Sequence, residues 1–256
     1  KDSQRTRNSN DVLLARNVSP TSYGVNVPSR NFTVELPFFG TGYANAFPLL
    51  ALNRHSIEIR IVLRTQAELG NVPLPNIEVN LQSAYLSDEH RQFFLGKQMD
   101  YIIRQTQLAR VTLGDLNQIR FKTEFENPVK EFVLVVQNDS GTSGVFDYSA
   151  NVVTGNYSSY SNDQVTRWKL FFNGQVYFDL DQMTMRAIQP YEYYIQTPSY
   201  KVNIFNVGQN SGVFPSGTVN MSRISSQIFE LTLVDNSITR KARLYAVNFN
   251  VFRCQG

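Results

Sequence analysis

The sequence predicts an all-β fold built as a sandwich or barrel, and three observations favour this class. Runs of alternating or β-branched residues recur along the 256 residues and are bounded by Gly, Pro or Asn. Charged residues make up only 18% of the chain, whereas asparagine and aromatic residues are plentiful. Only two segments have helical start and stop signals. Many short strands, few helices and long loops are typical of sandwiches and barrels.

The first strands are predicted in the N-terminal third, after a polar stretch over residues 1–11 that we expect to be a flexible lead-in. Their sequences are NFTVELPFF (31–39), SIEIRIVLR (56–64) and IEVNLQSAYL (77–86). In the second run, apolar and charged residues alternate with a period of two. This pattern predicts a strand with one face on a core and the other in water. The apolar positions are Ile57, Ile59, Ile61 and Leu63.

Eight further runs follow residue 98, and eight is the number of strands in a jelly roll. They are YIIRQTQLARVTL (101–113), QIRFKTEFE (118–126), EFVLVVQ (131–137), RWKLFF (167–172), QVYFDL (175–180), YKVNIFNV (200–207), IFELTLV (228–234) and RLYAVNFNVF (243–252). We therefore expect residues 98–256 to form one complete jelly-roll β-sandwich. Residues 12–86 are expected to form the last strands of a preceding, incomplete roll.

Two turns are predicted between these runs. The Asn173-Gly174 pair is the strongest local signal in the chain, because both residues tolerate the positive φ angles of a type I′ turn in a two-residue hairpin. A second turn is predicted at Pro215-Ser216-Gly217, which leads from the strand YKVNIFNV into the last pair of strands.

Two short helices are predicted. Residues 87–97 (SDEHRQFFLGK) begin with Ser87 as an N-cap, carry acids in the first turn and end at Gly96-Lys97. This segment is expected to link the two rolls. Residues 181–189 (DQMTMRAIQ) are predicted to form the second helix and to end before Pro190.

Composition excludes several classes of function. A net charge of +3 without a long basic run argues against a nucleic-acid site. No apolar run approaches the ~18 residues of a membrane span, and the polar N-terminus does not have the pattern of a signal peptide. The single cysteine, Cys254, excludes an internal disulfide framework and is interpreted as a lone thiol.

The residue types needed for catalysis are too few or wrongly placed. A metal site in a jelly roll needs two or three histidines with a carboxylate, and the chain has only His55 and His90. Neither histidine is accompanied by the Gly-x-Ser-x-Gly motif of a serine hydrolase. Alternation on a solvated sheet face explains the paired carboxylates more simply than glycoside hydrolysis does. Those pairs are Glu124 with Glu126 and Asp179 with Asp181. We expect no catalytic, metal or cofactor site and no enzyme activity.

Residues 138–166 form a long loop rich in Gly, Ser, Asn and Tyr. A loop of this length inside a compact domain is usually functional or mobile. A surface for contacts and a solvated variable loop remain the two interpretations.

Four blocks of sequence carry a resemblance to a known family. They are LPFFGTGYANAFPLLALNRHSIEIRIVL (36–63), AYLSDEHRQFFLGKQMDYIIRQTQ (84–107), NPVKEFVLVVQ (127–137), and VFPSGTVNMSRI with RLYAVNFNVFR (213–253). In this order and spacing the chain resembles the C-terminal part of the double jelly-roll major capsid proteins of nucleocytoplasmic large DNA viruses. The early strands of the first roll and the glycine-rich tail of that family are missing. Because an open roll exposes unpaired strand edges, the missing N-terminal part of the first jelly roll is an expected partner.

The resemblance implies a structural subunit of an icosahedral virus capsid. Three subunits would form a trimeric capsomer with a pseudo-hexagonal outline, because each subunit carries two rolls. The implied partners are the other subunits of the homotrimer, neighbouring capsomers and minor capsid proteins. The implied location is the capsid shell of the virion, assembled in the infected host cell, with the cytoplasm as the expected place.

On this resemblance, exposed loop residues are the candidates for contacts between subunits. The candidates are Phe146, Tyr148, Tyr157, Tyr160 and Arg223. Asn220, Ser222 and Arg223 either bond backbone groups at the corner after Gly217 or reach a neighbouring subunit. Tyr191, Tyr193 and Tyr194 either serve as further anchors or fill the core beside the 181–189 helix.

Two other functions remain as alternatives. A jelly-roll carbohydrate-binding module would stack loop aromatics on sugars and act as a monomer. A trimeric cytokine-like ligand is disfavoured because no signal peptide or membrane anchor is present in the sequence.

Overall fold

The computed structural model of the chain describes parts of both predicted rolls, residues 12–86 and residues 98–256. Described are residues 46, 48–52, 57–63, 76–80, 83–114, 116–138, 148, 163–198, 201–209, 216–234 and 239–255. They fall into two compact units. One lies within residues 105–250, and the other combines the described residues from 46 to 104 with residues 251–255.

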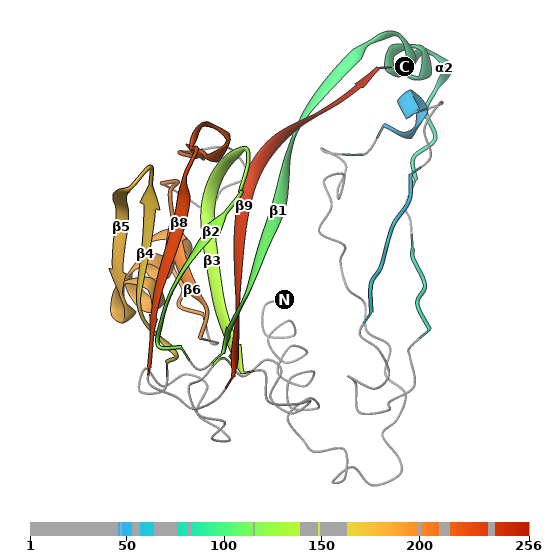
Figure 1. Cartoon of the computed structure of the whole chain (residues 1–256). Helices are drawn as coiled ribbons and strands as arrows, with labels where there is room; N and C mark the ends of the chain where they lie inside the picture. The colour runs from blue at the N-terminus through green and yellow to red at the C-terminus, as the bar shows by residue number, and fades with distance from the viewer. Residues whose placement is uncertain are drawn as a thin grey trace, which may run out of the picture. The chain divides into compact units, whose positions relative to one another are not determined.

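The strands form two antiparallel sheets (Figure 1). One sheet has the order β1–β9–β3–β6, with β7 also beside β3, and the other has the order β2–β8–β4–β5. The strands are β1 (Gln98–Gly114), β2 (Gln118–Thr123), β3 (Pro128–Asn138), β4 (Val165–Phe172), β5 (Gln175–Asp181), β6 (Asn203–Asn206), β7 (Val219–Asn220), β8 (Gln227–Leu233) and β9 (Arg240–Gln255). Strands β1 to β4 alternate between the two sheets, as do β7, β8 and β9, whereas β4 and β5 form a hairpin within one sheet. This arrangement is that of a jelly roll and confirms the predicted fold class.

Each of the eight runs predicted after residue 98 overlaps one strand, in the predicted order. The strand β7 was not predicted. It has only two residues, which pair as Val219–Val129 and Asn220–Pro128, and two residues are too few to give a strand pattern in the sequence. Strand β2 ends at Thr123, before the predicted end at residue 126. The chain turns shortly afterwards, where Asn127 adopts a positive φ of 64°.

The core lies between the two sheets and follows the period of two. On β3, Phe132, Leu134 and Val136 point inward and are at most 1% exposed. Rings from opposite sheets meet there: the centroids of Phe132 and Phe229 are 5.6 Å apart. Since a slip of one residue would turn every one of these side chains outward, the core fixes the register of the strands.

The helical segment after β5 departs from the prediction that it ends before Pro190. A π-helical turn, η5 (Thr184–Ile188), continues directly into α3 (Gln189–Tyr194). The N–H of Gln189 donates to the carbonyl of Thr184, five residues earlier. Pro190 therefore occupies the first turn of α3, where its missing N–H and fixed φ are tolerated.

In the other unit, the 3₁₀ turn η3 (Leu49–Leu52) packs beside α2 (Asp88–Gly96), which lies within the predicted helix at 87–97. The hydroxyl of Ser87 is 2.7 Å from Nδ1 of His90 and does not cap a backbone amide. Cys254 is buried, and desolvation raises the pKa of its thiol.

The strands predicted at 56–64 and 77–86 are not formed in the described residues. Residues 57–63, 76–80 and 83–86 belong to no strand, and Ile57, Ile59 and Ile61 are 37–49% exposed. The physical reason is that a strand needs a hydrogen-bonded neighbour, and no other described residues supply one here. The run at 31–39 and the lead-in at 1–11 lie outside the described residues.

Candidate functional site

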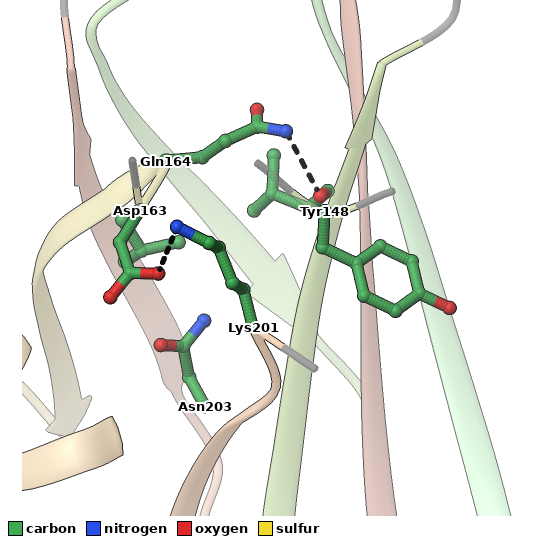
Figure 2. Close-up of a pocket in the computed structure, with 7 residues that line it drawn as sticks. Tyr148, Asp163, Gln164, Lys201 and Asn203 are labelled. Carbon is green, nitrogen blue, oxygen red and sulfur yellow. Dashed lines mark hydrogen bonds and ion pairs between the residues drawn. The ribbon is translucent and has the colours of Figure 1, made fainter. Parts of the chain in front are cut away.

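A cluster of buried charged side chains lies where the chain enters β4 after the long loop segment (Figure 2). Its centre is Asp163, whose side chain is 2% exposed. Oδ2 of Asp163 accepts hydrogen bonds from Nε of Arg186, at 3.3 Å, and from Nε2 of Gln182, at 2.9 Å. Nζ of Lys201 lies 3.3 Å from Oδ1. One carboxylate thus joins the start of β4, the helical segment around η5 and the entry to β6.

This ion cluster holds two cations around one anion. The side chains of Arg186 and Lys201 are each 3% exposed. Nη1 of Arg186 also donates to the carbonyl of Val202 at 3.2 Å. Because moving an ion out of water costs several kcal/mol, both cations depend on the partners that surround them, and they share the carboxylate of Asp163.

Two buried amide side chains connect the cluster to β3. Nε2 of Gln164 donates to the carbonyl of Val136 at 3.2 Å, and Nδ2 of Asn203 donates to the carbonyl of Leu134 at 3.4 Å. These bonds satisfy polar groups at the edge of the core. They fasten the end of the loop segment to the sheet.

Tyr148 is the one loop aromatic of the predicted set that the structure describes. It lies near Asp163, Lys201 and Asn203. Its ring points away from the ion cluster in Figure 2. Phe146, Tyr157 and Tyr160 lie outside the described residues, so their predicted role stays a prediction.

The corner after β7 is built from polar side chains. Oδ1 of Asn220 accepts the N–H of Ser222 at 3.2 Å, and Oγ of Ser222 accepts the N–H of Asn127 at 2.8 Å. Gln227 is 4% exposed. Its amide exchanges two hydrogen bonds with the backbone of Phe125, at 2.8 and 3.0 Å. Asn220 and Ser222 therefore bond backbone groups at the corner.

The hairpin turn between β4 and β5 is tied to this corner. Asn173 and Gly174 have φ angles of 50° and 86°. Oδ1 of Asn173 accepts hydrogen bonds from Oγ of Ser225 at 2.9 Å and from the N–H of Ser226 at 3.1 Å. One asparagine side chain thus ties the hairpin turn to the segment that enters β8.

The described part of the turn predicted at 215–217 lies against the end of β6. A Cβ on Gly208 would come within 3.1 Å of the carbonyl of Gly217 and of Oγ of Ser216. Gly217 has a φ of 149°, a value that favours glycine. Backbone packs on backbone here, and Pro215 lies outside the described residues.

The outer face of the sheet β2–β8–β4–β5 carries a charge ladder, which we define as Arg120, Glu230, Lys169, Asp179 and Arg167. Arg120 donates to Glu230 across β2 and β8. Nζ of Lys169 lies 3.6 Å from Oε1 of Glu230 and 3.7 Å from Oδ2 of Asp179. Arg167 donates two hydrogen bonds of 2.6 Å to Asp179. Opposite charges alternate across the four strands and stabilise their pairing.

Hydrogen bonds to arginine keep the ladder carboxylates ionised. The hydrogen bond from Arg120 lowers the pKa of Glu230 below its usual value, and the hydrogen bond from Arg167 does the same to the pKa of Asp179. The pKa of Asp181 is lowered by hydrogen bonding with Thr184, whose N–H donates to Oδ1 at 2.8 Å. The carboxylates at 179 and 181 are thus engaged in cross-strand pairing and in starting the helical segment.

The remaining predicted residues have different surroundings. Arg223 is exposed on the 3₁₀ turn η6 (Met221–Arg223) and forms no ion pair with any described residue. Tyr193 is 7% exposed and fills the core side of α3, whereas Tyr191 is 61% exposed. The hydroxyl of Tyr194 donates to the Glu131 carboxylate.

Within the described ranges, no group of three His, Cys, Asp or Glu side chains is placed to hold a metal ion. His90 is exposed on α2, and His55 lies outside those ranges. The described helices include none that is long and apolar enough to cross a membrane.

The described residues thus form an antiparallel jelly roll in which the buried ion cluster and the charge ladder join neighbouring strands and segments. The model of the family described as "Large eukaryotic DNA virus major capsid protein" matches residues 90–256, which is more than half of the chain. The chain belongs to this family, as its sequence predicted.

Individual relatives agree with this assignment. The chain is 28% identical over 188 residues to "Probable capsid protein 4" of Acanthamoeba polyphaga mimivirus, an alignment that covers 70% of this chain and 37% of that protein. It is 25% identical over 273 aligned positions to the "Major capsid protein" of Pyramimonas orientalis virus, covering 95% of this chain and 63% of that protein. The chain thus spans from about a third to just under two thirds of the length of these relatives.

A solved structure shows the same fold. The chain superposes on the structure described as "PBCV-1 virus capsid, quasi-atomic model" with a TM-score of 0.58 and 17% sequence identity. The superposition covers 67% of this chain and 53% of that one.

Proposed function

We propose that the protein is a structural subunit of an icosahedral virus capsid that forms trimeric, pseudo-hexagonal capsomers. The observation that carries this proposal is the family match over residues 90–256, a range that contains the whole jelly roll from β1 to β9. The function is geometric and non-enzymatic. The subunit must hold its shape while its surfaces bind copies of itself, and the buried ion cluster and the charge ladder provide that rigidity.

The proposal includes further partners and a place. The exposed β-branched residues at 57–63, which belong to no strand in the structure, are where we expect the N-terminal part of a first jelly roll to pair. Neighbouring capsomers and minor capsid proteins are the other partners. The site of action is the capsid shell of the virion, after assembly in the cytoplasm of the infected host cell. Contacts through Phe146, Tyr148, Tyr157, Tyr160 and Arg223 belong to the same proposal.

The native mass of the protein tests the proposal. The protein is purified from its natural source and measured by light scattering after size exclusion, with intact mass spectrometry of every chain present. A trimer supports the capsomer, and a second fragment in each subunit would identify the partner of residues 57–63. A stable monomer at the concentrations of assembly would contradict the proposal and favour the carbohydrate-binding alternative.

A further inference from the structure

The helical segment after β5 presents an apolar surface to solvent. Ile188, Tyr191 and Ile195 are spaced by three and four residues, so they share one helical face. They are 44%, 61% and 77% exposed. We call these three residues the α3 stripe. A subunit that used this segment only to cover its own sheet would have polar residues at these positions.

Ile195 has a backbone conformation that its residue type rarely adopts. It ends α3 with a φ of 59°, and its N–H donates to the carbonyl of Tyr191 at 2.8 Å. Glycine normally occupies this left-handed position, because a β-branched side chain is strained there. The subunit therefore tolerates strain to hold an isoleucine side chain in water, and this suggests a contact outside the subunit.

A second exposed surface of the same unit has the opposite character. Arg110 on β1 and Lys241 and Arg243 on β9 line a groove of about 240 Å³ with Val111, Thr112 and Ala242. None of these lining residues is acidic. No described carboxylate forms an ion pair with Arg110 or Arg243. We call this surface the cationic groove.

An acidic residue beside the α3 stripe is complementary in charge to the cationic groove. Glu192 lies next to Tyr191 on α3, is exposed, and forms no ion pair with a described residue. An acidic, apolar helix end fits a groove with cations on its rim. In a cyclic trimer each interface joins two different patches of neighbouring copies, so each copy must carry a matched pair of surfaces.

We infer that the α3 stripe, together with Glu192, docks into the cationic groove of a second copy of this chain. The inference rests on the proposed function, since it names the surfaces that close the trimer. Burial of Tyr191 and Ile195 supplies the apolar contact. The cations of the groove select the acidic helix end and disfavour a pairing of two like surfaces.

The variant Ile195→Gly in the full-length protein separates docking from folding. Glycine relieves the strain at φ 59°, so the isolated subunit should unfold at the same temperature or a higher one. The trimer should dissociate at a concentration at least about tenfold higher, because the anchoring side chain is lost. Val176→Ser on β5 is the matched control: Val176 is 55% exposed outside the stripe, and its loss should leave the trimer intact.

Charge reversal provides the second arm. Glu192→Lys should weaken the trimer, and Arg110→Glu, Lys241→Glu or Arg243→Glu should restore it in combination, as measured by light scattering across a dilution series. The inference is overturned if both Ile195→Gly and Glu192→Lys form trimers as stable as those of the wild type. It is also overturned if none of the three charge reversals restores the Glu192→Lys trimer. In either case the proposed capsomer still stands. A monomeric wild type contradicts the proposed function itself.

Discussion

Replacing Asp163 with asparagine tests whether the buried ion cluster holds the roll together. The change keeps the shape of the side chain but removes the charge that Arg186 and Lys201 share. Each of these cations lies 3.3 Å from a carboxylate oxygen, a Coulomb attraction of about 5 kcal/mol at an effective dielectric constant of 20. The surrounding structure relaxes in the variant and water enters the cluster, and both effects offset part of the lost attraction. We therefore expect a loss of about 3–5 kcal/mol, the usual cost of breaking a buried pair.

Urea unfolding followed by tryptophan fluorescence measures this loss, because Trp168 is the single tryptophan of the chain and is fully buried. About 4 kcal/mol corresponds to roughly a thousandfold change in the ratio of folded to unfolded protein. Adding Lys201→Met to Asp163→Asn should recover part of the stability, since one uncompensated cation is removed. Glu124→Gln is the control, because Glu124 is 85% exposed and should tolerate the change. If Asp163→Asn is as stable as the wild type, the reasoning about shared charge is refuted.

Three further predictions concern the ladder, the hairpin and the corner. The pKa of Glu230 is lowered from its usual 4.5 in the folded protein. The ionised carboxylate therefore stabilises the fold fully above pH 4.5, and this stabilisation is lost as the pH falls through the lower pKa of the folded state. Glu230→Gln should flatten the acid side of a plot of melting temperature against pH, and an unchanged plot would contradict this. Gly174→Ala places a Cβ at φ 86° and should cost about 1 kcal/mol in thermal unfolding, whereas Gly96→Ala, in helix α2, should cost nothing. Gln227→Leu leaves the buried polar backbone of Phe125 without a partner and should lower the free energy of unfolding by about 1–3 kcal/mol; equal stability would show that water replaces the amide.

Most of the sandwich could be predicted because its evidence is local. The β-branched, apolar run of β3 and the turn chemistry of Asn173-Gly174 depend on neighbouring residues only, and the structure shows a strand and a hairpin there. The helix end at Pro190 could not be predicted in the same way. The wide π turn that precedes it places the proline in a first helical turn, and no residue of the segment signals such a turn.

The ion cluster was missed for a different reason. Asp163, Arg186 and Lys201 come from three separate segments, and their convergence depends on the folded positions of β4, η5 and β6. In its local sequence, each of these residues is indistinguishable from a charged residue exposed to solvent. The strands expected at 56–64 and 77–86 show the converse case, since their alternation is strong but a strand forms only beside another strand.

The neighbours β1 and β9 set a condition on when the subunit can fold. Nε2 of Gln107 on β1 donates to Oδ1 of Asn248 on β9 at 3.0 Å, across 141 residues of sequence. Contacts over such separations form slowly, because closing a large loop costs chain entropy before the contacts contribute any stability. During synthesis β1 therefore cannot pair with β9 until this last strand of the roll has left the ribosome. A chain cut short before β9 would keep open edges on β1 and β3, which could pair with other chains. The sheet β1–β9–β3–β6 is therefore complete only once β9 has been synthesised and has paired.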